Sequence, residues 1–198
     1  MTTALIDADI VAYRCAATVE NDGPEIGCLR ADILMRDILT QTMADSYKAF
    51  LSGEDNFRYQ LFPLYKANRK DKPKPKYLPQ IQEFLLKEWK AEFSVGCEAD
   101  DLLGINQTEE TVICSIDKDL LQIPGNHYNF VKKELKWISL HEGLSNFYKQ
   151  LIIGDVSDNI PGFDGKARLK PPKFLGPELE NIDQCRTEQE MFESVQRL

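Results

Sequence analysis

Four apolar runs in this chain are each followed by closely spaced carboxylates, and this pattern constrains the fold more than any other feature. Two of the runs, residues 4–6 and 112–116, have the composition of buried strands. In open α/β folds, ligand sites form at the carboxyl ends of parallel strands, so we expect the acids to converge at one edge of a sheet. The acids after the four runs are Asp7 and Asp9; Glu98, Asp100 and Asp101; Asp117 and Asp119; and Asp155 and Asp158.

Carboxylates gathered in this way repel one another unless cations neutralise them. Mg²⁺ and Mn²⁺ prefer oxygen ligands, so the pattern predicts a site for two or more such ions. Two cations about 3.5–4 Å apart can activate water and neutralise the phosphoryl and leaving oxygens of a phosphodiester. The sequence has no Walker-type phosphate loop, no Ser/His/Asp signature and no zinc-ligand spacing that would compete with this chemistry.

Length and composition predict a reduced, cytoplasmic protein without a membrane partner. The 198 residues, 42% of them hydrophobic, suffice for one compact domain with a small appendage. No apolar run approaches the roughly 20 residues of a membrane span, and the N-terminus lacks a signal-peptide pattern. The five cysteines contain no Cys-x-x-Cys, which is typical of reduced thiols.

Two basic segments stand out against the net charge of −8. Such runs are often solvated surface, but local patches rather than net charge determine phosphate contacts. The first segment also contains two prolines and little apolar content, which predicts an exposed loop that becomes ordered when phosphates neutralise it. The two runs are Lys66, Arg69, Lys70, Lys72, Lys74 and Lys76, with Asp71 as their only acid; and Lys166, Arg168, Lys170 and Lys173.

Hydrophobic periodicity predicts an alternating α/β order. Asp9 is either the N-cap of the first helix or an outer group of the acidic site. The predicted strands are residues 2–7, 57–62, 92–95 and 111–116, with a hairpin over 127–131 and 135–139. The predicted helices are residues 10–20, 30–51, 77–89, one beginning near 99, and 140–153.

Five segments together resemble the structure-specific 5′-nuclease family, which includes flap endonucleases, phage 5′→3′ exonucleases and the nuclease domain of DNA polymerase I. Each motif is weak alone, but their order and spread up to residue 162 are specific, and the small phage-type members are the nearest in size. The segments are Leu-Ile-Asp-Ala-Asp at 5–9, Tyr-Lys-Ala-Asn-Arg at 65–69, Glu-Ala-Asp-Asp at 98–101, Ser-Ile-Asp-Lys-Asp at 115–119 and Gly-Asp-Val-Ser-Asp-Asn-Ile-Pro-Gly at 154–162.

The resemblance implies roles for individual residues. Lys66 and Arg69 would contact the scissile phosphate at the base of a helical arch, and Tyr65 would help to position the terminal nucleotides, although Tyr65 could instead be a core aromatic residue. Lys70, Lys72, Lys166, Arg168 and Lys170 are further candidates for substrate binding. The implied metal ligands, of which Asp7 and Asp101 are also counted as catalytic, are Asp7, Glu98, Asp100, Asp101, Asp117, Asp119, Asp155 and Asp158.

The implied fold is an α/β, PIN-like 5′-nuclease domain with a mostly parallel central sheet flanked by helices. We expect it to span residues 1–153, with a basic arch at about 64–77, and a DNA-binding segment to follow at 154–198. Residues 162–172 depart from the family's Gly-x-Gly-x-Lys turn, so a small helical or loop segment is expected in place of a helix–three-turn–helix.

The sequence thus predicts a monomeric, Mg²⁺- or Mn²⁺-dependent 5′→3′ exonuclease or flap endonuclease. Its substrates would be DNA with 5′ ends, flaps or nicks, and RNA–DNA hybrids if it also removes primers. A PIN-type endoribonuclease is the alternative enzyme, but it fits less well because such domains generally lack the arch and the Gly-Asp-x-x-Asp-Asn segment. A catalytically dead binding module would be suggested by missing acids, and the acids are all present.

Overall fold

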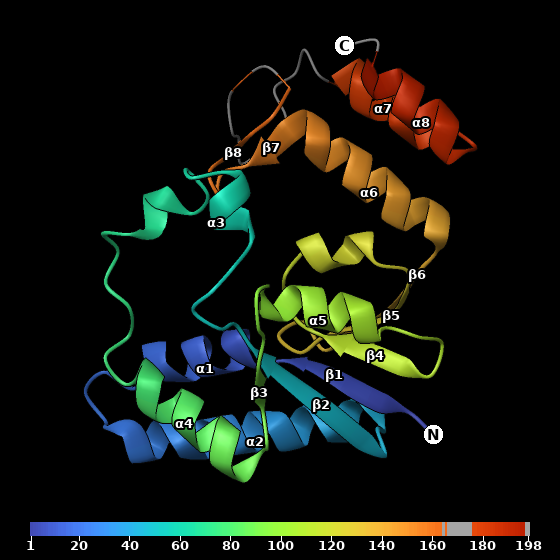
Figure 1. Cartoon of the computed structure of the whole chain (residues 1–198). Coiled ribbons are helices and arrows are strands. Elements are labelled where there is room, and N and C mark those ends of the chain that lie inside the picture. The colour runs from blue at the N-terminus through green and yellow to red at the C-terminus, as the bar shows by residue number, and fades with distance from the viewer. Residues whose placement is uncertain (164, 166–175, 197–198) are drawn as a thin grey trace. The chain divides into compact units, whose positions relative to one another are not determined.

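A computed structural model describes residues 1–163, 165 and 176–196 (Figure 1). The chain divides into two compact units. The first comprises residues 1–57, 73–120 and 125–137, and the second comprises residues 58–72, 121–124 and 138–198. The division is therefore not linear in the sequence, because the segment 58–72 groups with the C-terminal part of the chain.

A six-stranded sheet forms the centre of the first unit. Its order is β3-β2-β1-β4-β5-β6, and the β1–β2, β1–β4, β2–β3 and β4–β5 pairs are parallel. The expected, mostly parallel sheet is thus confirmed, and the acid-bearing strands β1 and β4 are neighbours. The strands are β1 (Thr3–Asp7), β2 (Ser46–Leu51), β3 (Glu92–Phe93), β4 (Thr111–Cys114), β5 (Gly125–Asn129) and β6 (Glu134–Ile138).

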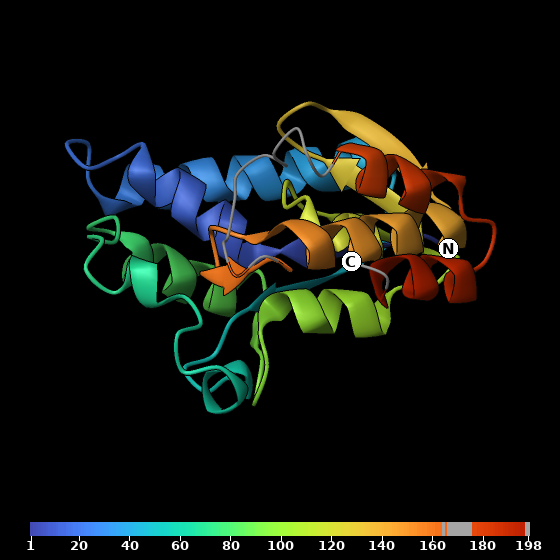
Figure 2. The ribbon, with the colours of Figure 1, turned by 90° about the horizontal axis from the view of Figure 1, so that it is seen from above.

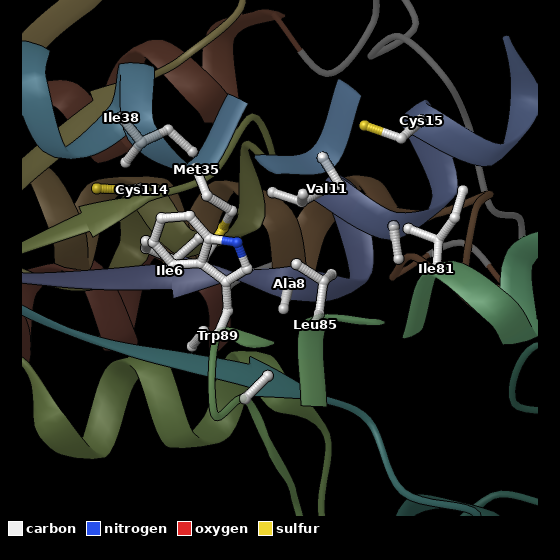
Figure 3. Close-up of a cluster of buried hydrophobic side chains, with 14 of the residues drawn as sticks. Ile6, Ala8, Val11, Cys15, Met35, Ile38, Ile81, Leu85, Trp89 and Cys114 are labelled. Atoms are coloured by element: carbon white, nitrogen blue, oxygen red, sulfur yellow. The ribbon is translucent and has the colours of Figure 1, made fainter. Parts of the chain in front are cut away.

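Helices cover both faces of this sheet. Figure 2 shows α1 (Ala8–Ala17) and α2 (Pro24–Thr42) on one side of the strands and α5 (Ala99–Asn106) on the other. Helix α4 (Leu78–Glu88) packs against α1 and α2. The core that these helices form with the sheet contains Ile6, Met35 and Leu85, all fully buried, and the buried Trp89 ring lies among them (Figure 3). This packing fixes the strand ends from which the acids project.

The predicted helix over 30–51 is wrong in its second half. Helix α2 ends at Thr42, Met43 adopts the left-handed conformation (φ 49°), and β2 follows. Tyr47 and Phe50 continued the helical spacing by coincidence, but the backbone of residues 46–50 pairs with β1 along its whole length. Long-range pairing therefore overrode the local pattern, as is common for β structure.

The predicted strand over 57–62 is also wrong, because the segment forms the short helix α3 (Arg58–Leu61). The Phe62 N–H donates to the Arg58 carbonyl at 2.8 Å, which closes the helical turn. Tyr59 and Leu61 are 45% and 76% exposed. The aromatic and aliphatic composition that suggested a half-buried strand instead belongs to a segment that presents these side chains to solvent.

The second unit has a small helical core. Tyr148 and Ile152 of α6 (Leu140–Ile153) pack with Ile182 of α7 (Gly176–Gln184) and Met191 of α8 (Glu188–Gln196). This confirms the expected small C-terminal helical segment.

A short antiparallel ribbon follows α6. Strand β7 (Gly154–Asp155) pairs with β8 (Ile160–Pro161). Gly154 has φ +74°, and a Cβ there would lie 2.3 Å from the Gly162 nitrogen, so only glycine fits. The ribbon therefore closes a tight loop that carries Asp155 and Asp158.

No helix in the described ranges combines the length and the apolar character needed to cross a membrane.

Candidate functional site

Asp7 is a buried carboxylate at the carboxyl end of β1. Its side chain is the N-cap of α1, with Oδ1 accepting a hydrogen bond from the Ile10 N–H at 3.0 Å. Oδ2 accepts from the Ser115 hydroxyl at 2.6 Å, across to the end of β4. Asp7 is only 2% exposed. The strand end, the helix start and the neighbouring strand thus hold this carboxylate in one orientation.

Ser115 links Asp7 to the acids that follow β4. Its Oγ accepts a hydrogen bond from the Asp117 N–H at 3.0 Å, and Asp117 Oδ1 accepts from the Asp119 N–H at 2.9 Å. Asp119 is the first residue of the 3₁₀ helix η2 (Asp119–Gln122). The residues of the Ser-Ile-Asp-Lys-Asp motif are therefore connected by side-chain hydrogen bonds to the buried carboxylate of β1.

A second chain of hydrogen bonds runs from Asp9 to the start of α5. Asp9 Oδ2 accepts from the Ser52 N–H at 2.9 Å, and Ser52 Oγ accepts from the Ala99 N–H at 3.0 Å. The N-cap interpretation of Asp9 is wrong, because Asp7 caps α1 and Asp9 lies in its first turn. Asp9 instead connects α1 to the end of β2.

Glu98, Asp100 and Asp101 lie at the N-terminus of α5. Glu98 and Asp101 form a capping box in which the Glu98 N–H donates to Asp101 Oδ2 at 2.9 Å. Asp100 lies in the same first turn. The capping box explains the three-residue spacing of Glu98 and Asp101, since each side chain bonds to the other's backbone. All three side chains are partly exposed.

Burial raises the pKa of Asp7 from 3.8 to about 7. The neighbouring carboxylates of Asp9 and Asp117 raise this pKa further, whereas the hydrogen bonds from Ser115 and Ile10 lower it. A buried carboxylate with acidic neighbours is stabilised in its charged form by a cation. The electrostatics of Asp7 therefore favour a site that binds positive charge.

The acids of the first unit, at the ends of β1 and β4 and at the start of α5, form a first cluster. Its donors fit hard divalent cations, because every candidate ligand offers carboxylate oxygens. Within the described ranges, however, no three or more His, Cys, Asp or Glu side chains are grouped so that they could hold a metal ion as they stand. The sequence-predicted acids of the first unit are thus joined by serine and backbone bridges at adjacent strand ends, but not as a ready-made coordination sphere.

The second cluster lies within the second unit and surrounds Asp158. Its carboxylate accepts a hydrogen bond from the Tyr65 hydroxyl at 2.8 Å and from Arg69 Nη2 at 2.5 Å. Lys66 Nζ lies 3.8 Å from the same carboxylate. Asp155, 4% exposed, accepts from the Asp158 N–H at 3.0 Å. The structure thus brings two predicted metal ligands together with the three residues at the predicted base of the arch.

Hydrogen bonds to backbone carbonyls also join the segment 64–69 to the loop 156–159. The Lys66 backbone is in the left-handed region (φ 52°), and its N–H donates to the Asp158 carbonyl at 2.9 Å. The 3₁₀ helix η1 (Ala67–Arg69) follows. Three side chains donate to carbonyls of the other segment: Asn68 Nδ2 to Val156 at 2.6 Å, Arg69 Nε to Ser157 at 2.7 Å and Asn159 Nδ2 to Leu64 at 2.8 Å.

Tyr65 is 3% exposed, and its ring packs edge-on against Tyr59, with the centroids 5.6 Å apart. Its predicted contact with nucleotides stays a prediction, but in this structure the more exposed aromatic ring is that of Tyr59. The segment 66–76 was expected to be an exposed loop, and residues 71–74 and 76 are exposed, but Pro75 is buried.

Lys70 and Lys72 are exposed, as substrate-binding residues would be. Lys166, Arg168 and Lys170 lie outside the described residues.

Four polar residues were missed from the sequence. Ser52 and Ser115 bridge the acids of the first unit, and Asn68 and Asn159 join the segment 64–68 to the loop after β7. Only Ser115 and the two asparagines lie inside the conspicuous motifs, and nothing in the local sequence marks Ser52.

Comparison with known proteins agrees with this picture. Residues 2–148 match the family described as "5'-3' exonuclease, N-terminal resolvase-like domain". A 5′-3′ exonuclease of Buchnera aphidicola subsp. Schizaphis graminum is 29% identical, over 96% of this chain and 75% of that protein. That of subsp. Acyrthosiphon pisum is 33% identical, over 74% of this chain and 57% of that protein.

A solved structure supports the fold. The bacteriophage T5 D15 flap endonuclease, in a pseudo-enzyme–product complex with DNA and metal ions, superposes with a TM-score of 0.62. The alignment covers 98% of this chain and 88% of that chain at 14% identity. The sheet, the acids at its strand ends and the family match over residues 2–148 agree, and the chain belongs to the 5′-3′ exonuclease family of nucleases.

Proposed function

We propose that the protein hydrolyses DNA phosphodiester bonds at or near 5′ ends with the help of divalent cations. One observation carries the proposal: buried Asp7 and its serine-linked acidic neighbours lie at the ends of adjacent parallel strands in a chain of this nuclease family. The T5 neighbour was solved with DNA and metal ions, which supports the same ligands here.

The cations are proposed to be Mg²⁺ or Mn²⁺, two or more in number, because the donors are carboxylate oxygens. When bound, such ions would supply an activated water and would neutralise charge on the phosphate. The proposed ligands are Asp7, Glu98, Asp100, Asp101, Asp117, Asp119, Asp155 and Asp158. Ser115 and Ser52 would keep the acids of the first unit oriented through the hydrogen bonds described above.

Lys66 and Arg69 are proposed to contact the scissile phosphate. Both side chains contact one carboxylate, that of Asp158, so the same pair can contact the oxygens of one phosphate group. An Arg guanidinium can bind a phosphate with two parallel hydrogen bonds and stabilise developing charge. Lys70 and Lys72 extend this basic surface.

Replacing Lys66 or Arg69 by alanine should lower the single-turnover cleavage rate roughly 10²–10³-fold, the usual effect of removing one charge-stabilising group. The affinity for duplex should change far less, because these groups act on transition-state charge. Rapid-quench cleavage of a labelled 5′-flap duplex measures the effect. Lys87→Ala, which removes an exposed lysine paired with Glu83, is the matched control. Equal losses in affinity and in rate would contradict the assignment.

The basic run after residue 165 is proposed to bind duplex DNA. Lys166→Ala and Lys170→Ala should each weaken binding and reduce the slope of log affinity against log salt by roughly 0.9. Fluorescence anisotropy at several salt concentrations measures both quantities. An unchanged affinity and slope in both variants would show that this segment is not the duplex-binding element.

The substrates are proposed to be 5′ flaps, nicked duplexes and, for primer removal, RNA annealed to DNA, acted on by a monomeric enzyme. Cleavage of each labelled substrate with Mg²⁺ or with EDTA tests this directly. Single-stranded RNA is included because a PIN-type endoribonuclease would cut it in preference to flapped DNA.

A further inference from the structure

The contacts of Asp158 are unusual for a residue that sequence motifs assign only to metal binding. Its carboxylate contacts a phenol, an ammonium group and a guanidinium group, all three from residues 65–69. Its side chain is only 18% exposed, against 47% for Arg69 and 20% for Lys66. These interactions are therefore partly shielded from water. Charge-assisted hydrogen bonds are stronger in such a shielded environment than in bulk water.

We propose that Asp158 is a positioning residue that builds the base of the arch before DNA arrives. It holds the cationic ends of Lys66 and Arg69 together. The Tyr65 hydroxyl donates to Asp158 Oδ2, the oxygen that Lys66 approaches, while Arg69 bonds to Oδ1. The inference rests on the proposed function only in that Lys66 and Arg69 act on the phosphate. The anchoring itself involves only contacts between residues of this chain.

The anchoring carboxylate is itself held in place by the fold. The Asp158 N–H donates to Asp155 Oδ1, and the β7–β8 ribbon closes the loop on both sides. Gln150 of α6 donates to the other Asp155 oxygen at 3.3 Å. A path of hydrogen bonds therefore connects α6, through Asp155 and Asp158, to Lys66 and Arg69.

Tyr65 also helps to position Lys66, because it contacts both Lys66 and Asp158. Its ring lies beneath Lys66, with Nζ 4.9 Å from the ring centroid, while its hydroxyl is bonded to Asp158. Tyr65 thus limits where the Lys66 ammonium can lie through a cation–π contact as well as through the shared carboxylate. In this role the tyrosine acts through Lys66 rather than by touching substrate.

Hydrogen exchange of the metal-free protein without DNA tests the proposal. The reporters are five amides of the segment 65–70, which donate to carbonyls of residues 62–67 or to that of Asp158: Tyr65, Lys66, Ala67, Arg69 and Lys70. Asp158→Asn and, separately, Tyr65→Phe should speed exchange there about tenfold or more, the factor that corresponds to 1.4 kcal/mol. Exchange in α6–α8 should stay within twofold. The matched control is Glu193→Gln, which changes an exposed acid bonded to Gln189 in the same unit.

Tyr65→Phe keeps every carboxylate, so it separates positioning from metal binding. It should lower the single-turnover cleavage rate about tenfold while leaving Mn²⁺ affinity, measured by calorimetry, and duplex affinity within twofold. Unchanged exchange at residues 65–70 in both Asp158→Asn and Tyr65→Phe would overturn the proposal, and so would a general rise throughout the second unit. An inactive wild-type protein would refute the nuclease proposal and would leave the exchange result valid.

Discussion

Asp119→Ala and Asp101→Ala are each expected to reduce cleavage by several orders of magnitude while the protein stays folded. In the proposed mechanism these carboxylates would hold the cations, which would supply an activated water and neutralise charge on the phosphate. Folding should tolerate both changes. The Asp119 backbone N–H still reaches Asp117 Oδ1, and loss of the Asp101 cap costs about 1 kcal/mol.

Single-turnover cleavage of a 5′-flap duplex, with circular dichroism melts of the same preparations, measures both parts of this prediction. The matched control is Asp22→Ala, which removes an exposed acid paired with Arg30 on the protein surface. Activity of the Asp101→Ala or Asp119→Ala variant near that of the wild type would contradict the cation assignment. Activity should also require Mg²⁺ or Mn²⁺, be lost in EDTA and be poorly supported by Ca²⁺.

Asp7→Asn is expected to stabilise the metal-free protein above neutral pH and to abolish activity. Burial raises the pKa of Asp7 to about 7 in the folded state, whereas the unfolded chain has the ordinary value of 3.8. The stability that this group contributes is fully present below pH 3.8 and is lost as the pH rises to about 7, by on the order of a few kcal/mol. Asparagine does not ionise and is an equally good N-cap.

Thermal melts in EDTA between pH 4 and pH 9 measure this difference. The wild-type melting temperature should fall through that window more steeply than that of Asp7→Asn, and the variant should be the more stable protein at pH 8. Mg²⁺ should raise the melting temperature of the wild type more than that of the variant, since a ligand of the folded state stabilises it. If the melting temperatures of the two proteins fell equally with pH, the ionisation of Asp7 would not destabilise the folded state, and the prediction would be contradicted. Asp45→Asn, at an exposed acid, is the control.

The sequence predicted those parts of the fold in which a local pattern and the long-range pairing agree. Strands β1 and β4 and helices α4 and α6 were predicted because their apolar runs are short and buried or strongly periodic. Strand β2 was missed because Tyr47 and Phe50 continue the helical spacing of α2, and only their pairing with β1 reveals the strand. Helix α3 was missed because its aromatic residues look like those of a strand.

In the candidate site too, features marked by a local sequence pattern were predicted and features that depend on long-range contacts were not. Acids after strands are visible in the sequence because parallel strands bring their carboxyl ends together. The bridging role of Ser52 and Ser115 was not visible, since each bridge joins residues far apart in the chain. The same is true of Asp158, whose contacts with Tyr65 and Arg69 span about ninety residues of sequence.

Cleavage of a 5′-flap duplex, labelled at the flap and within the duplex, tests the central claim most directly. The account predicts release of the flap or of short 5′ fragments with Mg²⁺, products that carry a 5′-phosphate, and no cleavage in EDTA or by the Asp119→Ala variant. Undiminished cleavage in EDTA, or cleavage of single-stranded RNA with the flapped DNA left intact, would contradict it.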